Sequence, residues 1–345
     1  MSLDELDRRL LFELDQNSRQ SIADLSRVMR LSRDRVLYRM KKLQNSGVLK
    51  GFSTAVNVQK LGLFVYKTYL RLEKNQGSFE PLIDHLHNHP LVDWIAETEG
   101  DWDLVFSIYG RNPFEFHSVQ REIISKYSEV ISQYNVYTLV EAYIFKKNFL
   151  VGRGQDSVYY GGKPAGIKYD EVDIEILRLL SEDSRLTKAE IGLRLDINPM
   201  VVKYRIDKLE ESQVILGYPI EIDFTKMGML TFKLQLHLAR YTKVFDGRLQ
   251  EYAKTNPYVT LLIRQIGDCA WELELEVESY HHLNDIITEL RTRFSREISS
   301  IDSIFIKQQR YKWVPFNYDY LQSEDSSPSR NLSDKNGAQS AASGR

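Results

Sequence analysis

The pattern of hydrophobic and polar positions occurs twice along the chain. Residues 3–57 and 169–223 align without a gap at an offset of 166 residues, and both segments carry apolar residues at helical spacing. Asp7 matches Asp173, and Ser18-Arg19 matches Ser184-Arg185. A repeat of this length is no solenoid unit, so it indicates two copies of a whole domain set.

Each repeat begins with three predicted short helices. In the first copy, segment 4–16 has helical periodicity, Ser21 can cap a second helix, and Ser32 can cap a third helix over 32–45. Apolar residues of the third helix fall at i, i+4 and i+7, which makes one stripe: Val36, Met40 and Leu43. The short turn between the last two helices is typical of a helix-turn-helix unit.

The second copy predicts the same unit. Asn198 is its cap, Pro199 takes the favoured first position of a third helix over 198–210, and the stripe repeats as Val202, Ile206 and Leu209.

After each helical unit the periodicity changes to that of strands and longer helices. The first half predicts strand 64–72, helix 79–88, strands 91–98 and 102–109, helix 113–127 and strand 131–145. The second half predicts strand 230–238, helix 246–255, strands 258–266 and 271–278, helix 280–294 and strand 301–311. The order β-α-β-β-α-β is that of a ferredoxin-like domain. The predicted fold class is therefore α+β, with two copies of a winged-type helix-turn-helix domain followed by a ferredoxin-like domain.

The strand that starts at Trp271 alternates apolar residues with glutamates. Such alternation predicts one buried face and one face in water. We expect the two sheets to pack face to face within one chain.

The domain boundaries follow from these patterns. They are a helix-turn-helix domain 1–58, a ferredoxin-like domain 59–151, a glycine-rich linker 152–168, a second helix-turn-helix domain 169–224 and a second ferredoxin-like domain 225–316. Residues 322–345 are polar with almost no apolar side chains, which predicts a disordered tail.

Composition limits the function classes. The 345 residues carry a net charge of −2, so nucleic-acid binding requires a local basic patch. One cysteine excludes an internal disulfide framework and, with no visible signal peptide, predicts a cytoplasmic protein. No apolar run approaches the roughly 20 residues of a membrane span. The chain has no P-loop, no dinucleotide fingerprint and no metal-ligand quartet, so we expect no cofactor, no metal and no catalytic residues.

These features together resemble the Lrp/AsnC family, the leucine-responsive or feast/famine regulators of archaea and bacteria. The resemblance lies in LDELDRRLLFELDQNSR, SIADLSRVMRLSRDRVLYRMKKLQNSGVLKGF and EGDWD, with weaker second-half counterparts that include IGDCAWE. It implies a first domain that binds double-stranded DNA and a second that dimerises, oligomerises and often binds an amino acid. Family members usually carry one such unit, so the tandem implies an intramolecular pseudo-dimer, which we expect to form homo-oligomers.

Recognition helices contact base edges mainly through their N-terminal half, while Lys and Arg hold phosphates. We therefore predict DNA contacts from the first and second units at Ser32, Arg33, Arg35, Tyr38, Arg39, Lys42, Lys203, Tyr204, Arg205 and Lys208. Arg33 and Arg35 could each bind guanine through two hydrogen bonds. Arg39 and Arg205 recur beside Asp7 and Asp173, so internal salt bridges explain them equally well. Arg19 and Arg185 could reach a phosphate or merely face solvent.

The second unit differs at the start of its third helix. Pro199-Met200-Val201 stands where the first unit has Arg33-Asp34-Arg35. We expect phosphate contacts and less base recognition from it, or no DNA binding at all.

The resemblance places effector sites at the Gly-Asp turns, with Gly100, Asp101, Asp103, Gly267 and Asp268 as the candidate residues. Glycine lets backbone amides approach a carboxylate, and Asp can pair with an α-amino group. Ordinary hairpin turns also favour Gly and Asp, so this alternative stays open.

Two rival functions remain. Some proteins of this architecture decarboxylate a tetrapyrrole (siroheme), for which His117, Arg121 and Arg264 could supply cationic groups. A DNA-free ligand sensor is the other. The run His85, His87, His89 lies at a predicted helix end, where the rings scatter, and Cys269 is interpreted as a packing residue.

Overall fold

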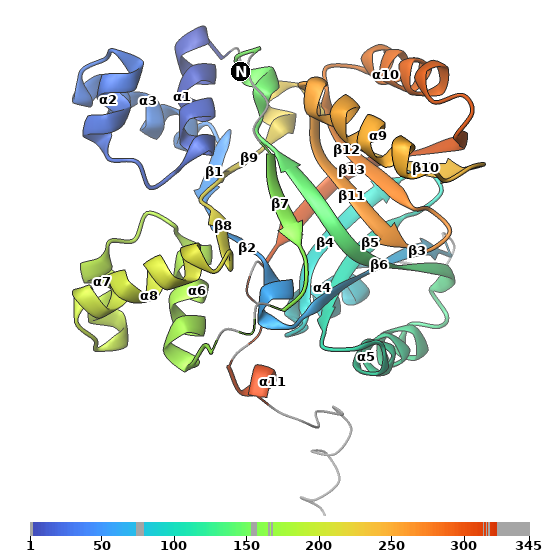
Figure 1. Ribbon diagram of the computed structural model, residues 1–345, viewed down its shortest axis with the longest axis horizontal. Coiled ribbons are helices and arrows are strands. Elements are labelled where there is room, and N and C mark those ends of the chain that lie inside the picture. The colour runs from blue at the N-terminus through green and yellow to red at the C-terminus, as the bar shows by residue number, and fades with distance from the viewer. Residues whose placement is uncertain are drawn as a thin grey trace, which may run out of the picture.

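The computed structural model describes residues 3–73, 79–152, 157–164, 166, 168–312, 314, 316 and 318–322. Figure 1 shows a layer of short helices on one side and a large curved sheet, flanked by longer helices, on the other. The expected tail lies outside the described residues apart from its first position, and so do residues 153–156, 165 and 167 of the expected linker.

The first helix-turn-helix unit consists of α1 (Glu5–Gln16), α2 (Ile22–Met29) and α3 (Arg33–Asn45). The side chains of Asp4, Ser21 and Ser32 accept hydrogen bonds from the first turns of these helices, as N-caps do. Ser32 and the stripe of α3 are therefore where the sequence predicted them.

The second unit repeats this arrangement with α6 (Glu171–Glu182), α7 (Lys188–Leu195) and α8 (Pro199–Glu211). Their caps are Asp170, Thr187 and Asn198. In both units the three stripe residues of the last helix are buried.

Short strands and 3-10 turns connect the helical layer to the sheet. They are β1 (Leu49–Phe52), β2 (Ala55–Val56) and η1 (Val58–Leu61) in the first half, and β8 (Ile215–Gly217), β9 (Ile220–Ile222) and η3 (Phe224–Met227) in the second. A further turn, η2 (Asn148–Leu150), packs against α1.

The βαββαβ order is present in each half. The first contains β3 (Phe64–Leu72), α4 (Glu80–Asn88), β4 (Val92–Glu99), β5 (Leu104–Gly110), α5 (Pro113–Lys126) and β6 (Ile131–Phe145). The second contains β10 (Leu230–Leu238), α9 (Lys243–Thr255), β11 (Val259–Ile266), β12 (Trp271–Val277), α10 (Tyr280–Arg293) and β13 (Ile298–Tyr311).

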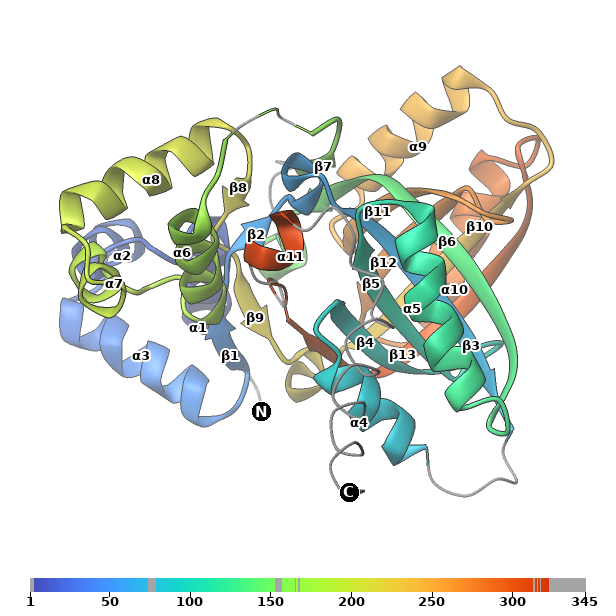
Figure 2. The ribbon, with the colours of Figure 1, turned by 90° about the horizontal axis from the view of Figure 1, so that it is seen from below.

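The two sheets do more than face each other. The long strand β6 pairs with β3 of its own half and continues along β11 of the other, and β13 likewise pairs with β10 and then with β4. The strand order β11-β12-β10-β13-β4-β5-β3-β6 therefore closes through β6–β11 into a barrel. The helices α4, α5, α9 and α10 lie outside it (Figures 1 and 2).

The segment expected to be a linker contains a strand. Residues Ser157–Gly161 form β7, which pairs with the second part of β6. Val158 and Tyr160 lie opposite Ile144 and Ala142, so pairing with an exposed strand edge orders this glycine-rich stretch. The chain then reaches α6, and a last short helix, α11 (Tyr318–Gln322), contacts α6.

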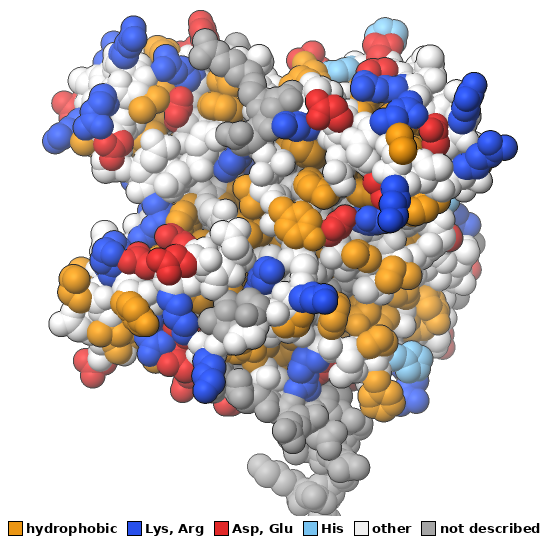
Figure 3. All heavy atoms as spheres, viewed as in Figure 1, with side chains coloured by type: hydrophobic (Ala, Val, Ile, Leu, Met, Phe, Trp, Pro, Cys, Tyr) orange, Lys and Arg blue, Asp and Glu red, His pale blue; other side chains and the backbone are white. Residues whose placement is uncertain are grey.

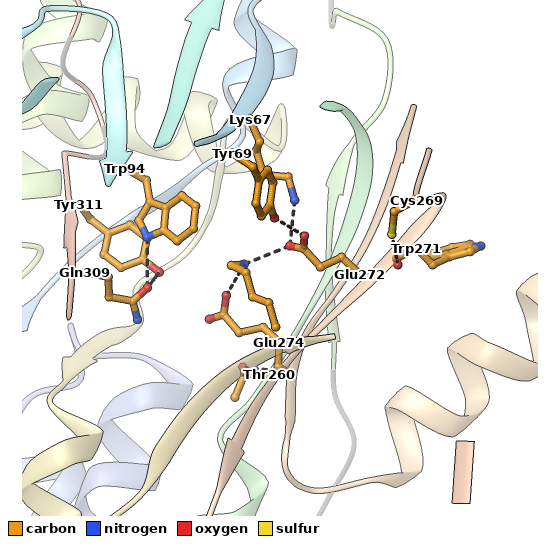
Figure 4. Close-up of polar contacts among 11 residues, drawn as sticks. Lys67, Tyr69, Trp94, Thr260, Cys269, Trp271, Glu272, Glu274, Gln309 and Tyr311 are labelled. Carbon is orange, nitrogen blue, oxygen red and sulfur yellow. Dashed lines mark hydrogen bonds and ion pairs between the residues drawn. The ribbon is translucent and has the colours of Figure 1, made fainter. Parts of the chain in front are cut away.

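The expectation that one face of β12 is exposed to solvent is wrong. Glu272, Glu274 and Glu276 are all buried, because their face points into the barrel and is covered by the other half. Lys67 donates to Glu272 at 2.8 Å (Figure 4). Lys233 donates to the same Glu272 oxygen at 3.1 Å and to Glu274 at 2.7 Å. A strand with buried, paired carboxylates at alternate positions thus has the same sequence pattern as a strand with one solvent-exposed face.

This ion cluster is asymmetric although the fold is not. Lys67 on β3 and Lys233 on β10 are equivalent positions of the two halves, but the first-half equivalent of Glu272 is Val105. Burial raises the pKa of Glu272, yet the ammonium groups of Lys233 and Lys67 outweigh it and hold that pKa at about 2. One carboxylate therefore neutralises cations from both halves.

Glu272→Gln tests this cluster. The variant leaves the buried Lys67 ammonium without its carboxylate, whereas Lys233 keeps Glu274; loss of a buried partner costs about 3–5 kcal/mol. We expect a lower free energy of unfolding in urea, whereas Glu251→Gln on the exposed side of α9 changes little. Equal midpoints for both variants would contradict the role given to Glu272.

The buried Asp93 on β4 should make the stability of the fold depend on pH. Desolvation raises its pKa to about 6, although the Ser107 and Tyr109 hydroxyls donate to it. The folded state therefore keeps a proton that the unfolded chain, with a pKa of about 3.9, has released. This contribution to stability is complete below pH 4 and is lost as pH rises to 6. Thermal unfolding of Asp93→Asn should lack that decline, and an unchanged pH profile would refute the assignment.

Candidate nucleic-acid interface

The outer face of α3 carries cations that the fold does not use. Ser32 starts the helix by accepting from the Arg35 backbone N–H at 3.4 Å, and the buried stripe fixes which face points away from the core. Arg33, Arg35 and Tyr38 are then exposed, Tyr38 at 72%, and Lys41 lies on the same outer side. These side chains have the residue types and the placement to reach DNA bases and phosphates.

Arg39 and Lys42 form salt bridges within the first unit. Arg39 donates to Asp4 at 2.8 Å and to the fully buried Asp7 at 2.5 Å, and Lys42 pairs with the other Asp7 oxygen at 2.8 Å. The hydrogen bond that Arg39 donates to Asp4 raises the pKa of Arg39, and the bond that Lys42 donates to Asp7 raises the pKa of Lys42. Of the two explanations that the sequence allowed for Arg39, the structure contains the salt bridge.

The second unit shows the same division. Arg205 bridges Asp170 and Asp173 at 2.7 and 2.8 Å, and Lys208 reaches Asp173 at 3.3 Å. Lys203 forms an exposed pair with Asp207 one turn on, and Tyr204 is 69% exposed. Lys203 and Tyr204 thus lie on the outer face, whereas Arg205 and Lys208 hold α8 to the start of α6.

Arg19 and Arg185 have a role that sequence reasoning missed. Each guanidinium crosses to the other unit: Arg19 donates to the carbonyl oxygens of Ser184 and Leu186, and Arg185 to those of Ser18 and Gln20. Between them the Ser18 and Ser184 hydroxyls lie 2.6 Å apart. The dipeptide Ser-Arg occurs at the same position in both copies, and this identity could have indicated a contact on a pseudo-twofold axis.

Strand pairing reinforces this contact. β1 pairs with β9 and β2 with β8, so the strand that follows each helical unit is completed by the other unit. Ile220 joins the core of the first unit, and Val56 joins that of the second. The two units are therefore one layer, with α3 and α8 at its opposite edges and α2 and α7 between them (Figure 2).

The outer surfaces of the two units differ in chemistry. In Figure 3, Lys and Arg side chains gather on the outer edge of the first unit, while apolar side chains appear on the outer edge of the second. The exposed apolar residues there are Leu193, Met200, Val201 and Tyr204.

The Gly-Asp turns lie where the halves meet. Both glycines have positive φ, 132° for Gly100 and 157° for Gly267. A Cβ on Gly267 would meet the Tyr137 ring at 2.3 Å, whereas one on Gly100 would lie 3.1 Å from the Ser303 carbonyl oxygen. Glycine is therefore required by close approach of the opposite half.

The aspartates of these turns already have partners. Asp103 accepts from the Leu72 backbone N–H at 2.9 Å, and Asp101 lies 3.7 Å from Arg71. Asp268 accepts from Asn135 at 3.3 Å.

Other candidate residues serve the packing. Cys269 is buried and donates to the Trp271 carbonyl oxygen at 2.9 Å, and burial raises the pKa of its thiol to about 12. His89 accepts from the Leu91 backbone N–H, and burial lowers its pKa to about 4. Arg264 pairs with Asp246 and Glu141 at 3.2 and 3.4 Å. Within the described ranges, no group of three His, Cys, Asp or Glu residues could hold a metal.

A family of winged helix-turn-helix DNA-binding domains matches residues 3–50 and again 169–215. An uncharacterised HTH-type transcriptional regulator of Pyrococcus abyssi is 32% identical over 140 residues, which are 40% of this chain and 91% of that protein. The HTH-type transcriptional regulators FL11 of Pyrococcus abyssi and LrpC of Bacillus subtilis are 29% and 28% identical, over 34% and 36% of this chain and 78% and 84% of their own lengths.

The chain belongs to the Lrp/AsnC family. Each of these relatives corresponds to well under half of its length, which agrees with two tandem family units in this Lrp/AsnC protein.

A solved structure of similar length shares the tandem fold. The siroheme decarboxylase NirDL, in complex with an iron-uroporphyrin III analogue, superposes with a TM-score of 0.60 over 91% of this chain and 94% of that one, at 12% identity. At that identity the likeness shows the fold alone. Among the described residues of this Lrp/AsnC chain, no helix has the length and apolar character to cross a bilayer.

Substitution separates structural from surface cations. Lys42→Ala removes a hydrogen bond to the buried Asp7 carboxylate and should therefore lower the free energy of unfolding. Lys41→Ala, the exposed neighbour, should stay within about 0.5 kcal/mol of the parent. Urea titrations measure both, and equal stability of the two variants would show that Lys42 is not part of the fold.

Proposed function

We propose that this chain is a sequence-specific DNA-binding transcription regulator in which both helical units face one duplex. The observation that carries the proposal is the pair of exposed cations at the start of α3, Arg33 and Arg35, whose side chains have no ion-pair partner within the described structure. Two family units with DNA-binding matches, held in one layer, support it further.

Binding would rely on a division of labour within α3. Arg33 and Arg35, in its first turn, are placed to contact base edges, and arginine can donate two hydrogen bonds to guanine. Tyr38 and Lys41 lie further along the same exposed side, where phosphates flank the groove. Arg39 and Lys42 then act indirectly, because they hold the helix against α1 through Asp7.

An amino-acid effector is the finer part of the proposal. The two turns are unequal, since the Tyr137 ring fills the space beside Gly267 while Ser303 stands at the equivalent place beside Gly100. We therefore assign effector binding to the turn at Gly100, Asp101 and Asp103. Ligand contact at this junction between halves would bias their packing, and through it DNA affinity.

We propose no catalytic role for this chain. The rival, a tetrapyrrole decarboxylase, needs free cationic groups for a polycarboxylate, whereas Arg264 is paired with Asp246 and Glu141, and His117 and Arg121 lie on the exposed side of α5. A tetrapyrrole absorbance shift on mixing with the protein would favour the enzyme. Lack of DNA retardation at low salt would favour a sensor without DNA.

The DNA test starts with fragments selected from a genomic library by the full chain. Arg33→Ala and Arg35→Ala should each weaken binding by about 1–3 kcal/mol if they contact bases. A variant that loses a phosphate contact should instead reduce the dependence on salt by about 0.9 in log–log slope. Electrophoretic mobility shifts at several salt concentrations measure both quantities.

Arg291→Ala on the exposed side of α10 is the matched control for a lost surface cation. Parent-like affinity of both α3 variants would reject the proposed face.

A further inference from the structure

The second unit has apolar residues at the start of α8, and at one position on α7, where the first unit has charged ones. Positions equivalent to Arg27, Arg33, Asp34 and Arg35 hold Leu193, Pro199, Met200 and Val201. Leu193, Met200 and Val201 are 85%, 70% and 41% exposed. They are therefore not core residues, because the stripe Val202, Ile206 and Leu209 already fills the core of this unit.

The backbone beneath this face is unchanged. α3 and α8 each have 13 residues and begin one residue after a capping side chain, Ser32 or Asn198. Arg30 and Asp196, at equivalent positions before the two caps, share a left-handed turn with φ of 54° and 53°. A preserved helix with a changed outer surface indicates a change of contact chemistry rather than a loss of the unit.

The surroundings of this face indicate its occupant. Arg194 lies next to Leu193 and is exposed, Lys203 pairs with Asp207 one turn after Met200, and Met200 replaces the negative charge of Asp34, so the centre of the face is apolar and uncharged. The match to DNA-binding domains covers residues 169–215, which include α8. The strand pairs β1–β9 and β2–β8 hold α8 in one layer with α3. In the proposed complex, the duplex that contacts α3 extends towards α8.

The DNA major groove offers one apolar group. The C5-methyl of thymine is the group that an apolar side chain can recognise there, and it distinguishes A·T from G·C pairs. Resting on the proposed DNA binding, we infer that Met200 and Val201 recognise thymine methyl groups in a second half-site, so that the operator is asymmetric. α3 would contact guanines in one half, and α8 thymines in the other.

The experiment changes the DNA rather than the protein. In the selected operator, the thymines of one half-site at a time are replaced by deoxyuridine, which removes only the methyl groups. Footprints of the full chain and of Arg33→Ala identify the half-site under α3. Replacement in the other half-site should weaken binding about fourfold for each contacted methyl, as expected for one buried methyl group. Replacement under α3 should have little effect.

A second set of measurements, with protein variants, tests whether α8 causes the loss of affinity for uracil. Met200→Ala/Val201→Ala should bind thymine and uracil operators equally, because the contacts are gone. Val244→Ala on α9, a valine that is 71% exposed, is the matched control and should keep the discrimination.

The outcomes separate this inference from the proposed function. Loss of affinity in Arg33→Ala, together with no effect of uracil in either half-site, would overturn the inference and leave DNA binding intact. A second half-site rich in G·C pairs would also overturn the inference. So would a changed oligomeric state of Met200→Ala/Val201→Ala with unchanged discrimination between thymine and uracil, because the apolar face of α8 would then contact protein. Parent-like binding by both α3 variants would instead refute the proposed function.

Discussion

The fold depends on one buried carboxylate shared by two equivalent lysines. Glu272 lies between Lys67 and Lys233, which occupy the same position in the two halves, and the first half offers only Val105 at the equivalent place. Pairing two copies of the first half would bury two lysines without this carboxylate, and an unpaired buried charge is strongly unfavourable. The interior charge pattern therefore favours union of unlike halves, and the exchanged strands β6 and β13 extend that union around the barrel.

The same pseudo-symmetry governs the helical layer with different chemistry. Arg19 and Arg185 exchange hydrogen bonds with backbone carbonyl groups, which is possible at equal positions because the acceptors are neutral. The two halves of the barrel are thus joined by opposite charges, whereas the two helical units are joined by identical residues at equivalent positions. The identical Ser-Arg residues at the pseudo-twofold axis hold the two units together. The outer surfaces of the units, which do not pack against each other, have diverged in sequence.

Much of this fold could be predicted from periodicity and capping residues. β3, β6 and β10 coincide with their predicted ranges, and Ser32 and Asn198 cap the helices they were expected to cap. Three features could not be predicted. The glutamates of β12 appeared to face water because local alternation does not reveal a covering partner. Strand β7 depends on an edge supplied by β6. The sequence also does not show that Lys42 and Lys208, which are predicted to contact DNA, pair with the buried carboxylates of Asp7 and Asp173.

Covalent tandem duplication changes how this layer is assembled. Single-unit proteins must meet before two helix-turn-helix units can lie side by side, so their paired state is lost on dilution. Here β1–β9 and β2–β8 form within one molecule, at an effective concentration set by the connecting chain and independent of how much protein is present. Dilution therefore does not separate the two helix-turn-helix units of one molecule.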